Sequence, residues 1–111
     1  MPTLDPEKLT QLRSYYGDEF LSELAVLYLE ASRRLVDGLN EGLLKGDLEQ
    51  VIRCAHDLKS TSAQLGAMDL SEAARELEEL ARGPAELQDL QERGQAFATL
   101  YSEAVTAVRA L

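Results

Sequence analysis

The chain contains a single histidine, His56, and Lys59 follows it three positions later. Residues three apart on a helix lie one turn apart on the same side, so the Lys59 ammonium can reach a group carried by the imidazole. A neutral imidazole can attack phosphorus through one ring nitrogen while a neighbouring acceptor holds the proton on the other. The phosphoryl group then brings close to two negative charges, which a lysine offsets. The pair therefore predicts a histidine that accepts a phosphoryl group.

Other chemistries find less support in the sequence. Cys54 is the only cysteine, and two positions from His56 on a helix the two side chains point apart, so we expect Cys54 to be a packing residue. One histidine cannot supply the paired Glu-x-x-His motifs of a bundle di-metal site, and we expect no metal. The glycines form no phosphate-binding loop, so we expect no ATP site, no self-phosphorylation and no cofactor on this chain.

Length and composition limit the function further. At 111 residues the chain is expected to form one domain, 1–111. The net charge is −9, with 20 acidic against 11 basic residues, which makes nucleic acid an unsuitable partner. No apolar run approaches the roughly 20 residues needed to span a bilayer, and the first residues lack the pattern of a signal peptide. We therefore expect no membrane association and a cytoplasmic location.

The apolar residues recur at spacings of three and four, and the composition, 45% hydrophobic but only 5% aromatic, favours helices with a core of Leu, Ala and Val. Glycines and Pro84 mark the expected ends. The helices are predicted over 7–16, 18–45, 48–65, 69–81 and 85–110. Short turns imply antiparallel neighbours, so the predicted fold is all-α, an up-down-up-down antiparallel four-helix bundle with a short N-terminal helix. Ala55 and Leu58 should face its core, which leaves His56 and Lys59 on the flanking solvent side.

Residues 55–67 resemble the motif of the histidine-containing phosphotransfer (HPt) family: a histidine, an apolar residue two on, a lysine three on, small residues, and a glycine ten on. The matching residues are His56, Leu58, Lys59, Thr61, Ser62, Gly66 and Ala67. The family fold is a four-helix bundle with the phosphorylated histidine exposed midway along one helix of the central hairpin, so the resemblance covers nearly the whole chain. It implies a phosphorelay intermediate. A receiver domain carrying a phosphoaspartate docks, His56 Nε2 attacks in line, and the phosphohistidine serves another receiver.

The resemblance also implies further site residues. Family members commonly have Gln or Glu 22 positions after the histidine, here Glu78, which accepts from the ring nitrogen that is not phosphorylated. Arg82 matches a basic residue that some members place near the phosphoryl group, although Glu78 and Arg82 also fit a routine surface ion pair. The usual glycine after the lysine is here Ser60, which would either crowd the partner or donate to phosphoryl oxygens. Thr61 is a second candidate phosphate contact.

The partners implied are receiver domains and a histidine or hybrid kinase, with Mg²⁺ on the receiver and this chain a monomer. Apolar residues near His56 are expected to form the partner surface, and Ala63 and Leu21 are the candidates. Glu78 is expected on the bundle surface, so that Glu78→Ala would slow transfer without disturbing the fold.

Two rival functions remain open. His56 to Ser60 also looks like the phosphoacceptor box of a sensor histidine kinase dimerisation domain, although that box normally continues with proline where this chain has Thr61. A helical scaffold with an incidental histidine is the second rival. The sequence leaves undecided which receivers it serves, the direction of phosphoryl flow, and whether the chain is free-standing or part of a hybrid kinase.

Overall fold

The computed structural model describes residues 3–111, which contain five α-helices. They are α1 (Pro6–Tyr16), α2 (Asp18–Lys45), α3 (Leu48–Gln64), α4 (Met68–Arg82) and α5 (Leu87–Arg109). No strand occurs within residues 3–111, so the predicted all-α class is confirmed. Each predicted helix boundary lies within two residues of the observed one.

Side chains and glycines set the helix ends. Asp5 precedes Pro6 and its carboxylate accepts from the backbone N–H of Glu7 at 3.0 Å, which caps α1. Asp47 caps α3 in the same way, accepting from Gln50 N–H at 3.2 Å. Gly66, just after α3, has a φ of +84°, a conformation that glycine adopts without strain. Its carbonyl accepts from the N–H of Asp5 at 2.8 Å, which ties the start of the chain to the end of α3.

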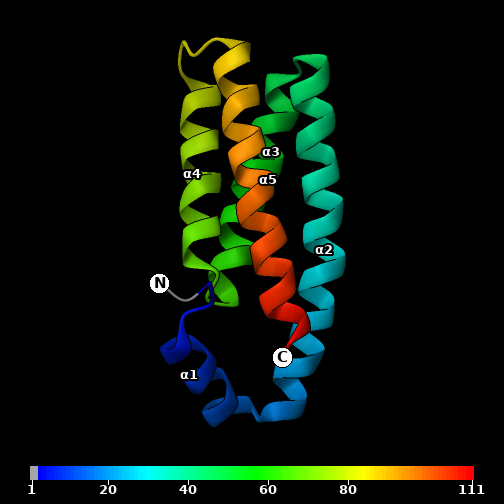
Figure 1. Ribbon diagram of the computed structural model, residues 1–111, viewed down its shortest axis with the longest axis vertical. Coiled ribbons are helices and arrows are strands. Elements are labelled where there is room, and N and C mark those ends of the chain that lie inside the picture. The colour runs from blue at the N-terminus through cyan, green and yellow to red at the C-terminus, as the bar shows by residue number, and fades with distance from the viewer. Residues whose placement is uncertain (1–2) are drawn as a thin grey trace.

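The four long helices run along the long axis of a bundle of 44 × 24 × 19 Å, and α1 lies at one end (Figure 1). α3 packs between α2 and α4, and α5 contacts the same two helices. α1 contacts α2 and buries none of its own residues. The long helices α3 and α4 therefore present one shared edge to solvent, and that edge carries the candidate site.

The helices α2 and α3 approach each other closely at two glycines. A Cβ on Gly38 would lie 2.8 Å from Cys54 Sγ, and one on Gly42 would lie 3.1 Å from the carbonyl oxygen of Asp47. Both glycines are interior residues of α2, and their absent side chains let α3 approach. Cys54 is half-buried in this contact, where burial raises the pKa of its thiol, in agreement with the predicted packing role.

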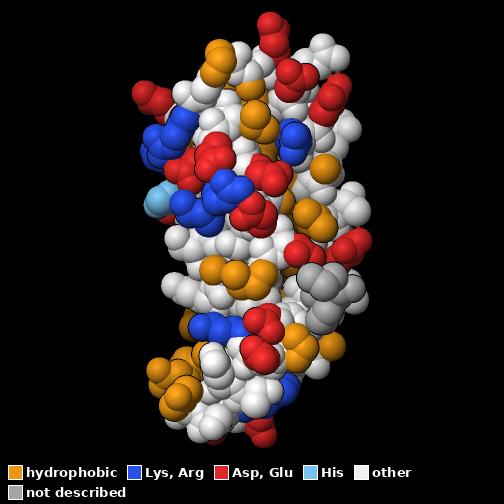
Figure 2. All heavy atoms as spheres, turned by 90° about the vertical axis from the view of Figure 1, so that its left-hand side faces the viewer, with side chains coloured by type: hydrophobic (Ala, Val, Ile, Leu, Met, Phe, Trp, Pro, Cys, Tyr) orange, Lys and Arg blue, Asp and Glu red, His pale blue; other side chains and the backbone are white. Residues whose placement is uncertain are grey.

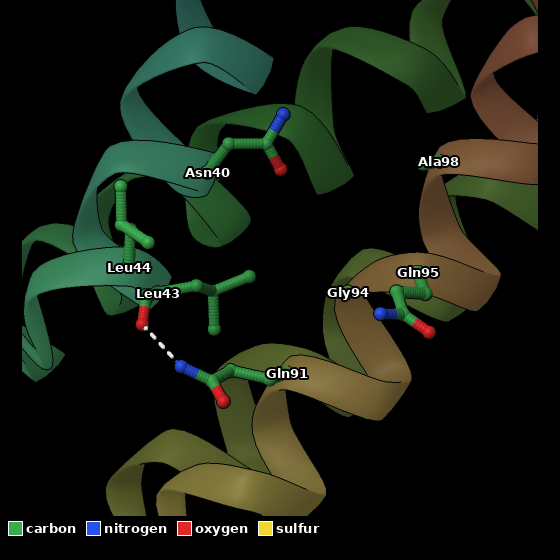
Figure 3. A pocket seen from close by; sticks show the side chains of 7 residues that line it. All are labelled: Asn40, Leu43, Leu44, Gln91, Gly94, Gln95 and Ala98. Carbon is green, nitrogen blue, oxygen red and sulfur yellow. Dashed lines mark hydrogen bonds between the residues drawn. The ribbon is translucent and has the colours of Figure 1, made fainter.

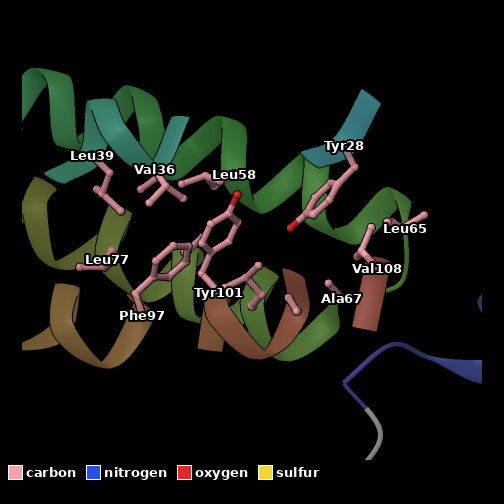
Figure 4. Packing of buried hydrophobic residues seen from close by; sticks show 14 of the residues in the cluster. Tyr28, Val36, Leu39, Leu58, Leu65, Ala67, Leu77, Phe97, Tyr101 and Val108 are labelled. Atoms are coloured by element: carbon pink, nitrogen blue, oxygen red, sulfur yellow. The ribbon is translucent and has the colours of Figure 1, made fainter. Parts of the chain in front are cut away.

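The core consists mainly of Leu, Ala and Val, as predicted, with Phe97, Tyr28 and Tyr101 among them (Figure 4). The two tyrosine hydroxyls are buried but satisfied. Tyr28 Oη shares a hydrogen bond of 3.0 Å with Ser62 Oγ, and Tyr101 Oη one of 2.8 Å with Ser32 Oγ. Ser62 therefore points into the core, which sets the rotation of α3 and turns the opposite side of that helix to solvent.

Candidate functional site

His56 lies near the middle of α3, on the side turned away from the core. Its neighbours Ala55 and Leu58 are fully buried, while its own side chain is 53% exposed. Figure 2 shows the imidazole protruding at the edge of the molecule, beside a group of Lys, Arg, Asp and Glu side chains. The predicted orientation of this segment is confirmed, and the ring is open to a second molecule.

Glu78 on α4 fixes the orientation of the ring. Its two carboxylate oxygens lie 3.2 and 3.1 Å from His56 Nδ1. An ionised carboxylate only accepts hydrogen bonds, so in the neutral ring Nδ1 must carry the proton and donate it. The lone pair is then on Nε2, which is the tautomer that a nucleophilic imidazole requires at that atom.

The Glu78 carboxylate also binds two cations. Lys59 Nζ donates to Oε1 at 3.1 Å, and Arg82 donates to Oε2 from Nε at 3.2 Å and from Nη2 at 2.9 Å. The side chain is only 9% exposed, so the expectation that Glu78 lies on the bundle surface is wrong. Burial by itself would raise the pKa of Glu78, but the bonds from Arg82, Lys59 and His56 outweigh it and lower that pKa to about 2.

We expect acid to weaken the fold through Glu78. Its pKa is about 2 in the folded chain against an ordinary value of 4.5, so the unfolded chain binds more protons between these values. The stabilisation is fully present above pH 4.5 and is lost as the pH falls towards 2. Glu78→Gln removes this titration. The difference in free energy of unfolding between wild type and variant, from urea denaturation, should shrink as the pH falls from about 6 to about 3.

Glu76→Gln is the control for this experiment, because Glu76 lies on the same helix in an exposed pair with Arg93. A difference between wild type and Glu78→Gln that stays constant over the whole pH range would contradict the prediction.

The structure distributes the remaining predicted site residues around α3. Ser60 is exposed and lies one turn beyond His56, on the same side of the helix. Thr61 is half-buried and faces α2, and Ala63 is half-buried. Leu21, expected on the partner surface, is only 2% exposed and belongs to the core, so that expectation is wrong. The exposed apolar residues of this part of α2 are instead Val26 and Leu27, at 56% and 60%.

A depression of about 340 Å³ lies beside the imidazole. It is lined by Ile52, Arg53, His56, Asp57 and Arg82. Sequence reasoning missed Arg53, although its position three residues before His56 mirrors that of Lys59 and could have indicated it. The depression therefore brings a second arginine to the exposed side of the site.

A second depression, of about 300 Å³, forms an apolar groove between α2 and α3. It is lined by Leu24, Leu27, Tyr28, Ala31, Thr61, Gln64 and Leu65. A third, of about 370 Å³, lies between α2 and α5, where Gln91 Nε2 donates to the carbonyl of Leu43 at 3.0 Å (Figure 3). No residue of α3 lines the third depression, whereas Thr61 and Gln64 of α3 line the second, so the second is the more relevant to His56.

Within residues 3–111, no group of three or more His, Cys, Asp or Glu side chains is arranged to hold a metal ion. In the same part of the chain, no helix combines the length and the apolar character needed to cross a membrane.

Comparisons with known proteins agree with this geometry. A family model described as Hpt domain matches residues 23–111. The fold is similar to the crystal structure of histidine-containing phosphotransfer protein B from Pseudomonas aeruginosa PAO1, with a TM-score of 0.89 and 27% sequence identity over 98% of this chain and 93% of that one. No curated protein sequence matches.

Proposed function

This chain belongs to the Hpt domain family and is a phosphotransfer intermediate of two-component signalling, and from that premise we propose that His56 is the residue that carries the phosphoryl group. The observation that supports this assignment best is an exposed imidazole whose Nδ1 donates to Glu78. Nε2 is thereby left unprotonated and open to a docked partner. An incidental histidine on a scaffold would not need a buried carboxylate to fix its tautomer.

We propose the following reaction. A receiver domain presents its phosphoaspartate to His56, and Nε2 attacks phosphorus in line with the aspartyl oxygen. The new N–P bond forms as the P–O bond to the aspartate breaks, and the aspartate leaves as a carboxylate. Glu78 holds the Nδ1 proton and balances the positive charge that develops on the ring. The receiver supplies Mg²⁺ and its acidic pocket, so this chain needs no cofactor of its own.

Lys59 and Arg82 are proposed to bind the phosphoryl oxygens. Both cations are held next to the imidazole by Glu78, within 3.2 Å of its carboxylate oxygens. A phosphoryl group with close to two negative charges can compete for these donors, since both side chains are partly exposed. Ser60, one turn beyond His56, is the hydroxyl best placed to add a contact, whereas Thr61, the second candidate, faces α2 and lies farther round the helix.

The same premise supports a proposal for the domain organisation, the oligomeric state, the location and the partners of the chain. We propose that 1–111 acts as one domain, with α2 to α5 as an up-down-up-down antiparallel four-helix bundle, and that it works as a monomer in the cytoplasm. Its partners are receiver domains and a histidine or hybrid kinase. Sedimentation separates this proposal from the rival dimerisation domain of a sensor kinase, because an obligate dimer would contradict it.

The apolar groove between α2 and α3 is proposed as part of the receiver-docking surface, together with Ala63. Leu24 and Leu27 take the place that Leu21 was expected to fill. The groove shares α3 with His56, and Thr61 and Gln64 line its other side. A receiver that covers the exposed side of α3 around the imidazole would thus also reach Leu27, which is 60% exposed.

Leu27→Asp is expected to slow transfer from a receiver about tenfold at a receiver concentration below saturation, the equivalent of about 1.4 kcal/mol of docking energy. Labelling by phosphoramidate, a small phosphoryl donor that needs no docking surface, should not change. Leu44→Asp is the matched control, because Leu44 lies on the same helix, is 82% exposed and is far along it from the groove. Equal transfer rates for the two variants would remove Leu27 from the docking surface.

The proposed function is tested by incubating the wild-type chain with phosphorylated receiver domains from the same genome. We expect a phosphate label on this chain that is labile in acid and stable in base, which is the behaviour of a phosphoramidate bond. A chain that takes no label from several receivers would contradict the proposed relay.

A further inference from the structure

We infer that Arg53 is a further phosphoryl-binding residue, which contacts the phosphoryl group on His56 from the side opposite Lys59. The inference rests on the proposed phosphorylation of His56. It gives a function to the depression beside the imidazole, which would hold phosphoryl oxygens between Arg53 and Arg82.

The position of Arg53 on α3 supports this role. Lys59 lies three residues after His56 and Arg53 three residues before it, so the two cations flank the imidazole one turn away on either side. Arg82 reaches the same depression from α4. Two arginines from two helices thus line the depression beside the imidazole, and Lys59 lies one turn along α3 on the other side, bound to Glu78.

The hydrogen bonds separate Arg53 from the other two cations. Lys59 and Arg82 already donate to Glu78, whereas Arg53 makes no ion pair within 4.0 Å and no side-chain hydrogen bond to any residue in 3–111. Its guanidinium can therefore bind a phosphoryl oxygen without first breaking a bond inside the protein. Arginine suits this contact because its planar fork of N–H donors matches two phosphoryl oxygens.

The charges around the depression show why a third cation is needed. Lys59 and Arg82 both bind the carboxylate of Glu78, and Asp57 adds a second negative charge in the depression itself. With Arg53, three cations face two carboxylates, so these five side chains carry a net charge of +1. A phosphoryl group would bring nearly two negative charges next to Asp57, and Arg53 reduces that repulsion at short range.

The test measures the pKa of the phosphoryl group by ³¹P NMR as a function of pH. The wild-type chain and its variants are labelled with phosphoramidate, whose P–N bond breaks as His56 Nε2 bonds to phosphorus and ammonia leaves. The second ionisation of a protein phosphoryl group lies near pH 6 in phosphoserine, so a titration around neutral pH covers it. A cation in contact with the group lowers its pKa.

Arg53→Gln is expected to raise the pKa of the phosphoryl group by about half a unit, a smaller effect than an arginine has on a buried carboxylate because the site is exposed. Arg53→Lys should restore most of the wild-type value. Arg109→Gln makes the same change in net charge in the last turn of α5 and should leave the phosphoryl pKa unchanged.

The two ways in which this experiment can fail are distinguishable. If wild type gives no phosphohistidine signal, the proposed phosphorylation of His56 is wrong and the role of Arg53 falls with it. If wild type is labelled but Arg53→Gln and Arg109→Gln titrate alike, only the role of Arg53 is overturned.

Discussion

Replacing His56 with glutamine is expected to reduce the acid-labile label on this chain to background, a loss of more than about a thousandfold in transfer rate. The amide of glutamine has no nucleophilic nitrogen, and no other imidazole exists in the chain to replace it. The label is measured by the initial rate of phosphate transfer from a phosphorylated receiver.

The fold should survive this substitution. The His56 side chain is 53% exposed and contributes nothing to the core, so the change in stability should stay within about 1 kcal/mol. A thermal melt of the variant next to wild type checks this. Undiminished acid-labile label on a folded His56→Gln chain would move the phosphoryl group to another residue and refute the assignment.

The second large effect is expected at Glu78. Glu78→Ala removes the acceptor that holds the proton on Nδ1, so the lone pair is no longer confined to Nε2. We expect transfer to slow by about 10- to 100-fold, the range seen when the hydrogen-bond partner that orients a metal-bound histidine is removed. Glu78→Gln should lose less, because the amide oxygen still accepts from Nδ1.

Two controls separate orientation of the ring from loss of structure. Glu76→Ala removes a carboxylate from the same helix without touching His56, and should transfer at the wild-type rate. Glu78→Ala also leaves Lys59 and Arg82 without their shared partner. The fold of this variant is therefore no longer expected to be undisturbed, and its stability must be measured beside its transfer rate. Equal transfer rates for the Glu78 and Glu76 variants would remove Glu78 from the site.

The elements of the fold could be predicted because the signals that build them are local. Apolar spacing located the four long helices, and glycines such as Gly66, together with Pro84, marked helix ends by rules that hold in any helix. The exposed side of α3 followed from Ala55 and Leu58. None of these conclusions required knowledge of how far apart two helices lie.

The predictions for Leu21 and Glu78 were wrong because the burial of both side chains depends on how the helices pack against each other. Leu21 and Leu27 both belong to the apolar stripe of α2, but only the position of α3 determines that one is core and the other lines a groove. Glu78 was expected at the surface because carboxylates are rarely buried unless they are paired. It is buried since three donors converge on it, and two of them come from another helix.

The position of Gly66 in the fold limits what the sequence motif can indicate about activity. It is buried at the end of α3, and a side chain there would press against Lys8. Leu58, Ser62 and Ala67 are buried as well, so four of the seven motif residues serve the packing of the bundle, whatever the chain does. A relative that has lost its chemistry can thus keep most of the motif, and inheritance of the activity is to be judged at positions 56 and 78.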